Sequence, residues 1–383
     1  MLFKEIPGNS LVKKQLVATI TQNRVSHAQL FSGNSGSAKL ALAFAYARYL
    51  NCHNKSNEDS CATCPSCIKY NTLSHPDLHL VFPVLKAGGT KSSVSDNFLK
   101  EWRDFTLKNP YNSLDNWTNS FGVENKKGEK GSIYKDEAVS IHKKLALKNF
   151  EATYRVILIW MPEQMNTNAA NKLLKVFEEP PLGTVFLLVS EDPEKLLPTI
   201  ISRLQKIHIH DFNMDDLLGF FKKENVSSEK AKQLVNLTDA DLGKIIQLLM
   251  DDTQEIDLFN LFSSWMRLVY QIDIVNISKW VDSLAATGRK HQNTFLLYAI
   301  KMIRECLIFN FANKLLLKTN QKEFDFVSKF SNFIHEDNSV LIIEKLENSS
   351  KAINRNANAK ILFFELSLQI IKLLKVKRKF AIN

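Results

Sequence analysis

The sequence predicts a parallel α/β domain followed by helices alone. Short apolar runs alternate with helical patterns up to about residue 210, and this alternation is typical of a mainly parallel sheet. From Met214 onward only helical periodicity is present. Gly and Pro are scarce, with 12 and 10 among 383 residues, which favours long helices. The 45% hydrophobic and 23% charged content excludes a wholly disordered chain.

The chain begins with a helix, a strand, a glycine-rich loop and a second helix. Asn9 and Ser10 can cap the first helix. The apolar run 28–31 predicts a buried strand, which leads into the loop 33–36. From Lys39 the residues LALAFAYARYL resume helix propensity without a breaker. A strand, a glycine loop and a helix in this order are typical of the opening of a nucleotide-binding unit.

The rest of the α/β domain follows the same alternation. Consecutive prolines after a run of helical residues end the helix, because proline removes a backbone donor. Alternation of Ile and His near residue 208 is typical of a short strand. The predicted elements are a strand over 156–159, a helix over 166–177, a strand over 185–189, a helix over 193–204 and a strand over 207–210.

Composition divides the chain into three predicted domains. Residues 1–210 form the α/β domain, 211–253 a small helical domain, and 254–383 a domain of longer amphipathic helices. A polar stretch that also carries aromatic residues interrupts the first domain at 86–134. We interpret it as a partly ordered insertion with a flexible tip near 125–131.

Charge and hydropathy constrain location and partners. The net charge is +10, a mild excess that favours an anionic partner. No apolar stretch is long enough for a membrane span, and the amino-terminal residues lack the apolar core of a signal peptide. We therefore expect a cytoplasmic protein without a membrane partner.

Four of the five cysteines lie within sixteen residues. Cys52, Cys61, Cys64 and Cys67 are separated by eight, two and two residues. Thiolates at this spacing can converge on one tetrahedral ion, and four of them leave no open position for water. The pattern predicts a structural zinc site, while adventitious disulfides and unliganded thiols stay open as alternatives.

The glycine loop is a degraded version of a phosphate-binding loop. The full pattern is G-x-x-x-x-G-K-[ST], in which the hydroxyl binds magnesium. Gly33, Gly36 and Lys39 are in place, but Ala38 replaces the second glycine and Leu40 replaces the hydroxyl. Leucine cannot bind magnesium. Weak nucleotide binding remains open, as does an ordinary solvated role for the lysine.

The second magnesium-binding element is also missing. ATPases of this type end a buried strand with carboxylates, whereas here Trp160, Met161 and Pro162 follow the strand and the first carboxylate is Glu163. Two independent losses predict a protein that does not hydrolyse ATP. The alternative is an active ATPase whose magnesium ligands are displaced, for example to Glu163 and Ser37.

Several segments carry a family resemblance. The segments are HAQLFSGNSGSAKLALAFA, CATCPSC, HPDL, MNTNAANKLLKVFEEPP and TIISRLQ. In this order and spacing they resemble the delta-prime subunits of the bacterial DNA polymerase III clamp loader, which are AAA+ proteins, and more distantly the tau/gamma subunits. LGKIIQLL and NRNANAKILFFELSL resemble the second domain and the helical collar of that family.

The resemblance implies a three-domain AAA+ type subunit of a five-membered ring, with tau/gamma and delta subunits as partners. Such a ring opens the sliding clamp and places it on primed DNA, and its delta-prime member is generally stationary and inactive as an ATPase. The resemblance also implies that Ser202-Arg203 belongs to the Ser-Arg-Cys motif, whose arginine reaches a neighbouring ATP site. Leu204 stands in place of the cysteine. A local ion pair of Arg203 is the alternative.

Two further features have plain interpretations. Asn171, Glu178 and Glu179 are interpreted as ordinary solvated or capping residues. The basic end of the chain could make the zinc loop and tail a DNA-binding module, although a charged terminus is more often only solvated. Its residues are Lys372, Lys375, Lys377, Arg378 and Lys379.

Overall fold

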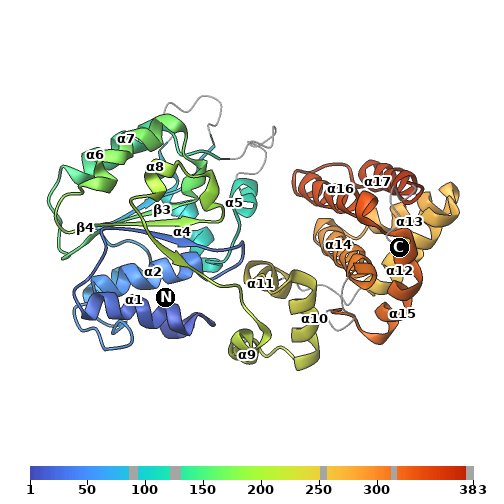
Figure 1. The fold of residues 1–383 in the computed structure, drawn as a ribbon, viewed down its shortest axis with the longest axis horizontal. Helices are drawn as coiled ribbons and strands as arrows, with labels where there is room; N and C mark the ends of the chain where they lie inside the picture. The colour runs from blue at the N-terminus through green and yellow to red at the C-terminus, as the bar shows by residue number, and fades with distance from the viewer. Residues whose placement is uncertain (86–93, 121–130, 251–256, 312–316, 377–383) are drawn as a thin grey trace. The chain divides into compact units, whose positions relative to one another are not determined.

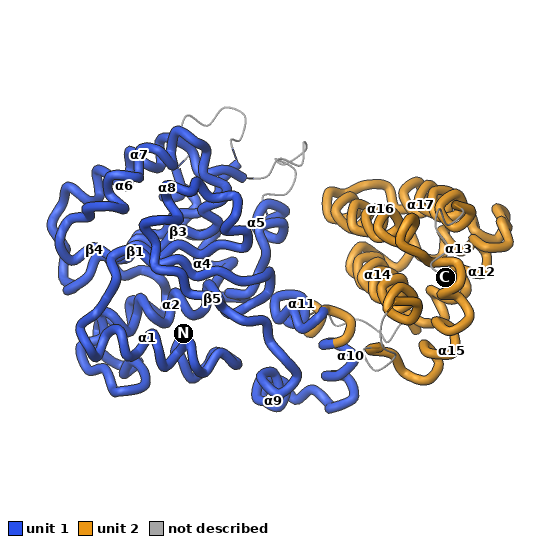
Figure 2. The backbone as a smooth tube through the Cα atoms, in the orientation of Figure 1, with its two compact units in different colours: residues 1–235, 239–246 blue, residues 236–238, 247–383 orange. Residues whose placement is uncertain are grey.

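The protein is described by a computed structural model that covers residues 1–85, 94–120, 131–250, 257–311 and 317–376. The chain forms two compact units, which Figure 2 shows in different colours. Unit 1 comprises residues 1–235 and 239–246, and unit 2 comprises residues 236–238 and 247–383. The predicted division into three domains stays a prediction.

A five-stranded parallel sheet forms the centre of unit 1. The strand order is β2-β3-β4-β1-β5, and every pair of neighbours is parallel. This confirms the predicted parallel α/β class, and it adds β2, a strand of four residues that is too short for a clear periodic signal. The strands are β1 (Ala28–Ser32), β2 (Leu78–Val81), β3 (Arg155–Trp160), β4 (Thr184–Ser190) and β5 (Gln205–His208).

Helices cover both faces of the sheet (Figure 1). α1 (Ser10–Thr21) and α2 (Lys39–Leu50) lie on one face, and α6 (Lys135–Leu145) and α7 (Thr167–Glu178) lie on the other. Every residue of α2 is buried, which explains its run of small, apolar and aromatic side chains over 40–47. Strands β3 and β4 are buried along their whole length, as expected for a parallel sheet between two helical layers.

Two helix predictions need correction. Asn9 precedes α1, but its side chain does not cap the helix. Instead, Asn9 Oδ1 accepts a hydrogen bond from the His210 backbone amide at 3.1 Å, and Asn9 Nδ2 donates to the His210 carbonyl at 3.2 Å. The single helix predicted over 193–204 is divided into η5 (Pro193–Lys195) and α8 (Pro198–Ile201). Proline explains the division, because it disfavours helical geometry in the residue before it.

The segment predicted as an insertion is ordered where the structure describes it. It contains η2 (Ser95–Phe98), α4 (Leu99–Lys108) and α5 (Leu114–Ser120). Trp102 stacks on Phe82 with ring centroids 4.7 Å apart, so aromatic packing anchors α4. The predicted flexible tip at 125–131 lies outside the described residues except for Gly131.

Three helices follow the sheet: α9 (Met214–Lys223), α10 (Ser228–Thr238) and α11 (Leu242–Met250). Asn213 and Ser227 cap the first two of them, since each side chain accepts a hydrogen bond from a backbone amide of the first turn. The first half of α11 belongs to unit 1. The purely helical character predicted from Met214 onward is confirmed for the described residues.

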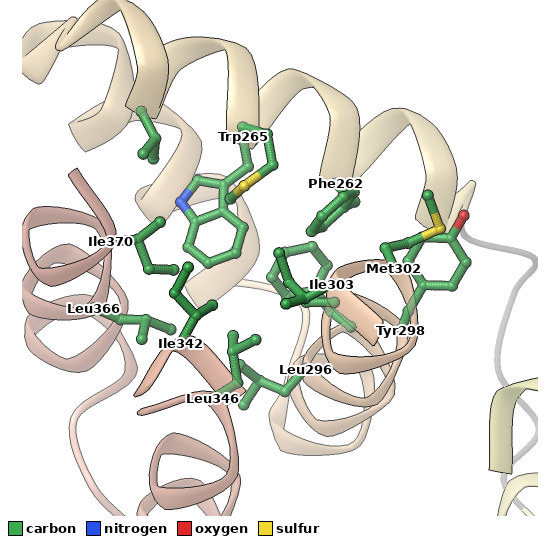
Figure 3. Packing of buried hydrophobic residues seen from close by; sticks show 14 of the residues in the cluster. Phe262, Trp265, Leu296, Tyr298, Met302, Ile303, Ile342, Leu346, Leu366 and Ile370 are labelled. Carbon is green, nitrogen blue, oxygen red and sulfur yellow. The ribbon is translucent and has the colours of Figure 1, made fainter. Parts of the chain in front are cut away.

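Unit 2 is a helical bundle around an aromatic core (Figure 3). Trp265 stacks on Trp280 with ring centroids 5.2 Å apart, and its indole donates to the Ser367 hydroxyl at 2.9 Å. None of the described helices is both long and apolar enough to cross a membrane. The elements are α12 (Leu258–Gln271), α13 (Ile274–Ala285), α14 (Arg289–Phe311), α15 (Gln321–Phe330), η7 (Ser331–Phe333), α16 (Glu336–Asn354) and α17 (Ala359–Leu374).

Candidate functional site

The four clustered cysteines converge on one point beside the sheet domain. Cys52 follows the end of α2, and Cys64 and Cys67 lie at the start of α3 (Pro65–Asn71). With Cys61, their sulfur atoms all lie within 4.8 Å of one another. Tetrahedral zinc with sulfur ligands would hold sulfur atoms about 3.8 Å apart. The four residues predicted as ligands are therefore brought together in an arrangement that suits a structural zinc site.

Backbone amides already point at these sulfurs. The N–H of Cys61 donates to Cys52 Sγ at 3.2 Å, that of Cys64 to Cys61 Sγ at 3.3 Å, and that of Cys67 to Cys64 Sγ at 3.4 Å. Such bonds stabilise thiolates. Amide donors lower the pKa of the Cys61 thiol to about 5, whereas burial raises that of Cys52 to about 12. A bound dication would favour the thiolate form at both positions.

A buried arginine lies next to the cysteines. Arg48 of α2 is 2% exposed, and its Nε and Nη2 find no hydrogen-bond acceptor among the described residues. Burial raises the pKa of the Cys67 thiol, and the Arg48 guanidinium opposes that rise. Zinc with four thiolates carries a net charge of about −2, so the buried guanidinium is a suitable counter-charge. The donor set and its surroundings therefore fit zinc.

The degraded phosphate loop lies at the carboxyl end of β1. Lys39 is buried, and its ammonium group donates to the Asn34 carbonyl at 2.7 Å and pairs with the Glu191 carboxylate at 3.1 Å. Glu191 directly follows β4, the strand next to β1. The solvated role considered for Lys39 is wrong, because the loop and the neighbouring strand enclose it.

A second carboxylate covers the loop at Gly36. This residue has a φ of +74°, which favours glycine, and a Cβ there would overlap the Asp241 carboxylate and lie 2.9 Å from the Asp241 Cα. Asp241 is at the start of α11, where its Oδ1 accepts a hydrogen bond from the Lys244 amide at 3.0 Å. Leu40 is buried in α2 and provides no magnesium ligand.

The strand end that would hold magnesium is built differently here. Met161 follows β3 with a φ of +55°, a left-handed conformation that is uncommon for a methionine. Glu163 Oε1 accepts from the amides of Glu191 and Asp192 at 2.9 and 3.3 Å, so this carboxylate closes the turn after β4. Burial raises the pKa of Glu163. The Ser37 hydroxyl is buried and has no hydrogen-bond partner among the described residues.

Arg203 lies just after α8 and pairs with a carboxylate of its own chain. Its guanidinium binds Glu178 at the end of α7, and it also donates to the Thr199 carbonyl at 2.5 Å. The side chain remains 32% exposed. The local ion pair considered for Arg203 is therefore present. Glu178, interpreted from sequence as a plain solvated residue, is its partner.

Glu191 and Asp241 are site residues that were not predicted from the sequence. Glu191 had a usable signal, because the carboxyl ends of neighbouring parallel strands meet at one edge of a sheet. Asp241 had none, since it follows Gly36 by some two hundred residues and no periodicity connects the two. Both acidic residues contact the predicted loop residues, whereas Ser202 and Arg203 make no described contact with that loop.

Comparisons with known proteins agree on one family. The family model described as DNA polymerase III, delta subunit matches residues 8–213. DNA polymerase III subunit delta' of Bacillus subtilis is 27% identical over 63% of this chain and 59% of its own length. The tau subunit of the same organism is 27% identical over 58% of this chain and 31% of its own length. The delta' subunit of Yersinia pestis is 28% identical over 50% of this chain and 43% of its own length. The matches span less than two thirds of each relative.

Replacing one ligand tests the metal centre. We expect Cys64→Ser to lower zinc content and to reduce the melting temperature by at least about 5 °C, because a zinc-linked loss of about 2 kcal/mol shifts a domain of this size by that much. Metal analysis and thermal unfolding measure both quantities. The lone Cys306, buried in unit 2 outside the cluster, provides the control variant Cys306→Ser for zinc content. Full stability with zinc absent would contradict a structural role.

Arg48 provides a second test of the same centre. We expect Arg48→Met, which keeps an unbranched apolar side chain but removes the guanidinium, to weaken zinc binding by about tenfold or more, because the metal–thiolate group loses its buried counter-charge. Competition with a chromogenic chelator measures the affinity. Arg24→Met, at an exposed position after α1, controls for the loss of one positive charge. Unchanged zinc affinity in Arg48→Met would show that the guanidinium does not balance the negative charge of the metal–thiolate group.

Proposed function

Because the chain belongs to the DNA polymerase III delta' family, we propose that it is the non-hydrolysing delta' subunit of a clamp loader. In this proposal it supplies Arg203 in trans to the ATP site of a neighbouring ATPase subunit during loading of the sliding clamp on primed DNA. The observation that carries the proposal is the phosphate loop, whose lysine is paired with Glu191 of the same chain.

The chemistry of the loop supports the absence of hydrolysis. Phosphoryl transfer needs a cation on the phosphates and a magnesium ion held by oxygen ligands. Lys39 is already paired, Leu40 offers no oxygen, and Glu163 holds two backbone amides. The alternative ATPase, with magnesium held by Glu163 and Ser37, would have to break the hydrogen bonds that close the turn after β4.

The setting of Arg203 supports a role in trans. The guanidinium group of arginine, which binds carboxylates, also matches phosphate oxygens, and it is always charged. Arg203 is partly exposed next to Glu178, so its guanidinium can exchange this carboxylate for another anion such as a phosphate group. The ion pair with Glu178 is in this proposal the resting position of the arginine.

Partners and cofactors follow from the same proposal. Similarity to tau and to gamma/tau subunits supports a multi-subunit complex in which tau/gamma and delta subunits are the neighbours. Zinc would stabilise the first domain, the chain would bind ATP weakly or not at all, and it would reach the clamp and primed DNA through the complex. The site of action would be the cytoplasm. A DNA-binding role of the basic end stays a hypothesis, and 377–379 lie outside the described residues.

Substitution of Arg203 tests the proposal. We expect a complex assembled with Arg203→Ala to hydrolyse ATP at least about a hundredfold more slowly at the affected site, because an arginine finger contributes several powers of ten to the rate. The measurement is clamp- and primed-DNA-stimulated hydrolysis by a mixture of this chain with tau/gamma and delta subunits. This chain alone is expected to show no turnover.

Two controls make the result specific. Arg203→Lys keeps the charge but not the planar pair of donors, so it should restore only part of the rate. Arg24→Ala removes an exposed arginine elsewhere and should leave the rate unchanged. Gel filtration shows whether each complex assembles. An assembled Arg203→Ala complex with the full rate, or turnover by the wild-type chain alone, would contradict the proposal.

A further inference from the structure

The phosphate loop of this chain has two positions at which a phosphate group would contact it, and a carboxylate of the same chain occupies each of them. The first is the ammonium group of Lys39, and the second is the space over Gly36. In a working loop of this type, phosphate oxygens contact the lysine and the backbone approaches them closely where glycine leaves room. Here Glu191 binds the lysine at 3.1 Å, and the Asp241 carboxylate lies against the glycine.

We propose that Glu191 and Asp241 act as an internal substitute for a polyphosphate ligand, so that the start of α11 is held on the α/β domain without any bound nucleotide. The site beneath them is a latent polyphosphate site. This inference rests on the proposed non-hydrolysing function and gives it a structural cause. It concerns unit 1 alone, since residues 239–246 belong to that unit.

The start of α11 is fixed on two sides, which explains why the carboxylate is held in place. Besides Asp241 on the loop, Gly243 packs against the insertion: a Cβ on Gly243 would lie 3.0 Å from the Tyr111 carbonyl carbon. The Gly243 carbonyl accepts a hydrogen bond from the Asn109 amide at 3.1 Å. The Asp241 side chain is 10% exposed, and its Oδ2 also pairs with the Lys244 ammonium group at 3.3 Å.

The position at Lys39 is occupied by Glu191, which directly follows strand β4. Glu191 is held through its own backbone amide, which donates to Glu163 at 2.9 Å, so its carboxylate has a fixed origin at the end of β4. The Lys39 side chain is 4% exposed and the Glu191 side chain is 25% exposed. The Glu191 Oε1 that faces the lysine is buried, so the exposed part of the pair is the rest of the glutamate side chain. Removal of the glutamate charge would leave the lysine without its counter-charge and favour an external anion there.

The test removes the carboxylate from both positions with minimal change to the fold. Asp241→Ser shortens the side chain but keeps an oxygen that can cap α11, and Glu191→Gln keeps the shape while it removes the charge. We expect the full-length chain with both substitutions to bind inorganic triphosphate at least about tenfold more tightly than the wild type, since a charge-assisted hydrogen bond contributes more than a factor of ten. Titration calorimetry measures the affinity.

Stability provides a second readout. The doubly substituted chain should melt at a lower temperature than the wild type, and triphosphate should raise its melting temperature by binding only the folded state. Amide hydrogen exchange in the first turn of α11 should be faster in this variant and slow again with triphosphate. Glu191→Gln alone, which leaves the cap of α11 untouched, should show a smaller gain in affinity.

Two controls identify the site. Adding Lys39→Ala to the doubly substituted chain should abolish the gained binding. Asp215→Ser combined with Glu194→Gln removes the same number of negative charges at exposed positions and should gain nothing. A folded doubly substituted chain without tighter binding would overturn the inference, and so would an equal gain in the charge control.

Failure of this inference is separable from failure of the proposed function. If the wild-type chain stays inactive as an ATPase while the doubly substituted chain binds no triphosphate, only the latent site is refuted. If the wild-type chain binds triphosphate tightly and hydrolyses ATP by itself, the proposed non-hydrolysing function fails as well. Loss of the Arg203 effect in the assembled complex, with the triphosphate result intact, would refute the trans role alone.

Discussion

A buried lysine that needs a counter-charge constrains the centre of this fold. Lys39 begins α2, a helix whose every residue is buried between the sheet and its neighbours. An unpaired buried ammonium would cost several kcal/mol, so some anion has to lie beside it. The parallel sheet provides one, because β4 lies next to β1 and places Glu191 at the same edge. The turn that carries Glu191 in turn depends on Glu163, which explains why Glu163 is a structural group here.

The cysteine cluster also needs a counter-charge, but here the buried charge is negative and the counter-charge is positive. Four sulfur atoms within 4.8 Å cannot all be thiolates without nearby positive charge. Arg48 lies on α2, the helix that also carries Lys39, so the two ends of one buried helix each hold a cation. One faces a carboxylate and the other faces the cysteines. A substitution that shifted α2 would therefore disturb both sites together.

The sequence predicted the parts of this molecule that depend on local patterns. Buried strands at 28–31, 156–159 and 185–189 and the spacing of the cysteines were clear, because each is specified by neighbouring residues. The short strand β2 and the interruption at Pro198 were missed, since four residues carry little periodicity and a proline can either begin or break a helix. The contacts of Asp241 and Glu178 could not be derived from their surroundings in the chain, because each depends on how distant elements pack.

A carboxylate differs from a phosphate ligand in one respect that matters for the whole subunit. Nucleotide binds, is hydrolysed and leaves, so the elements it joins change their arrangement with each cycle. Asp241 and Glu191 are covalently part of the chain, so the contacts they make do not depend on nucleotide. With those contacts permanent, the sheet edge and the start of α11 would keep one arrangement throughout a hydrolysis cycle of the proposed neighbouring ATPase. Arg203 follows β4 through a short segment of the same domain, and a fixed support would suit the trans role proposed for this arginine, in which it meets a phosphate with correct geometry.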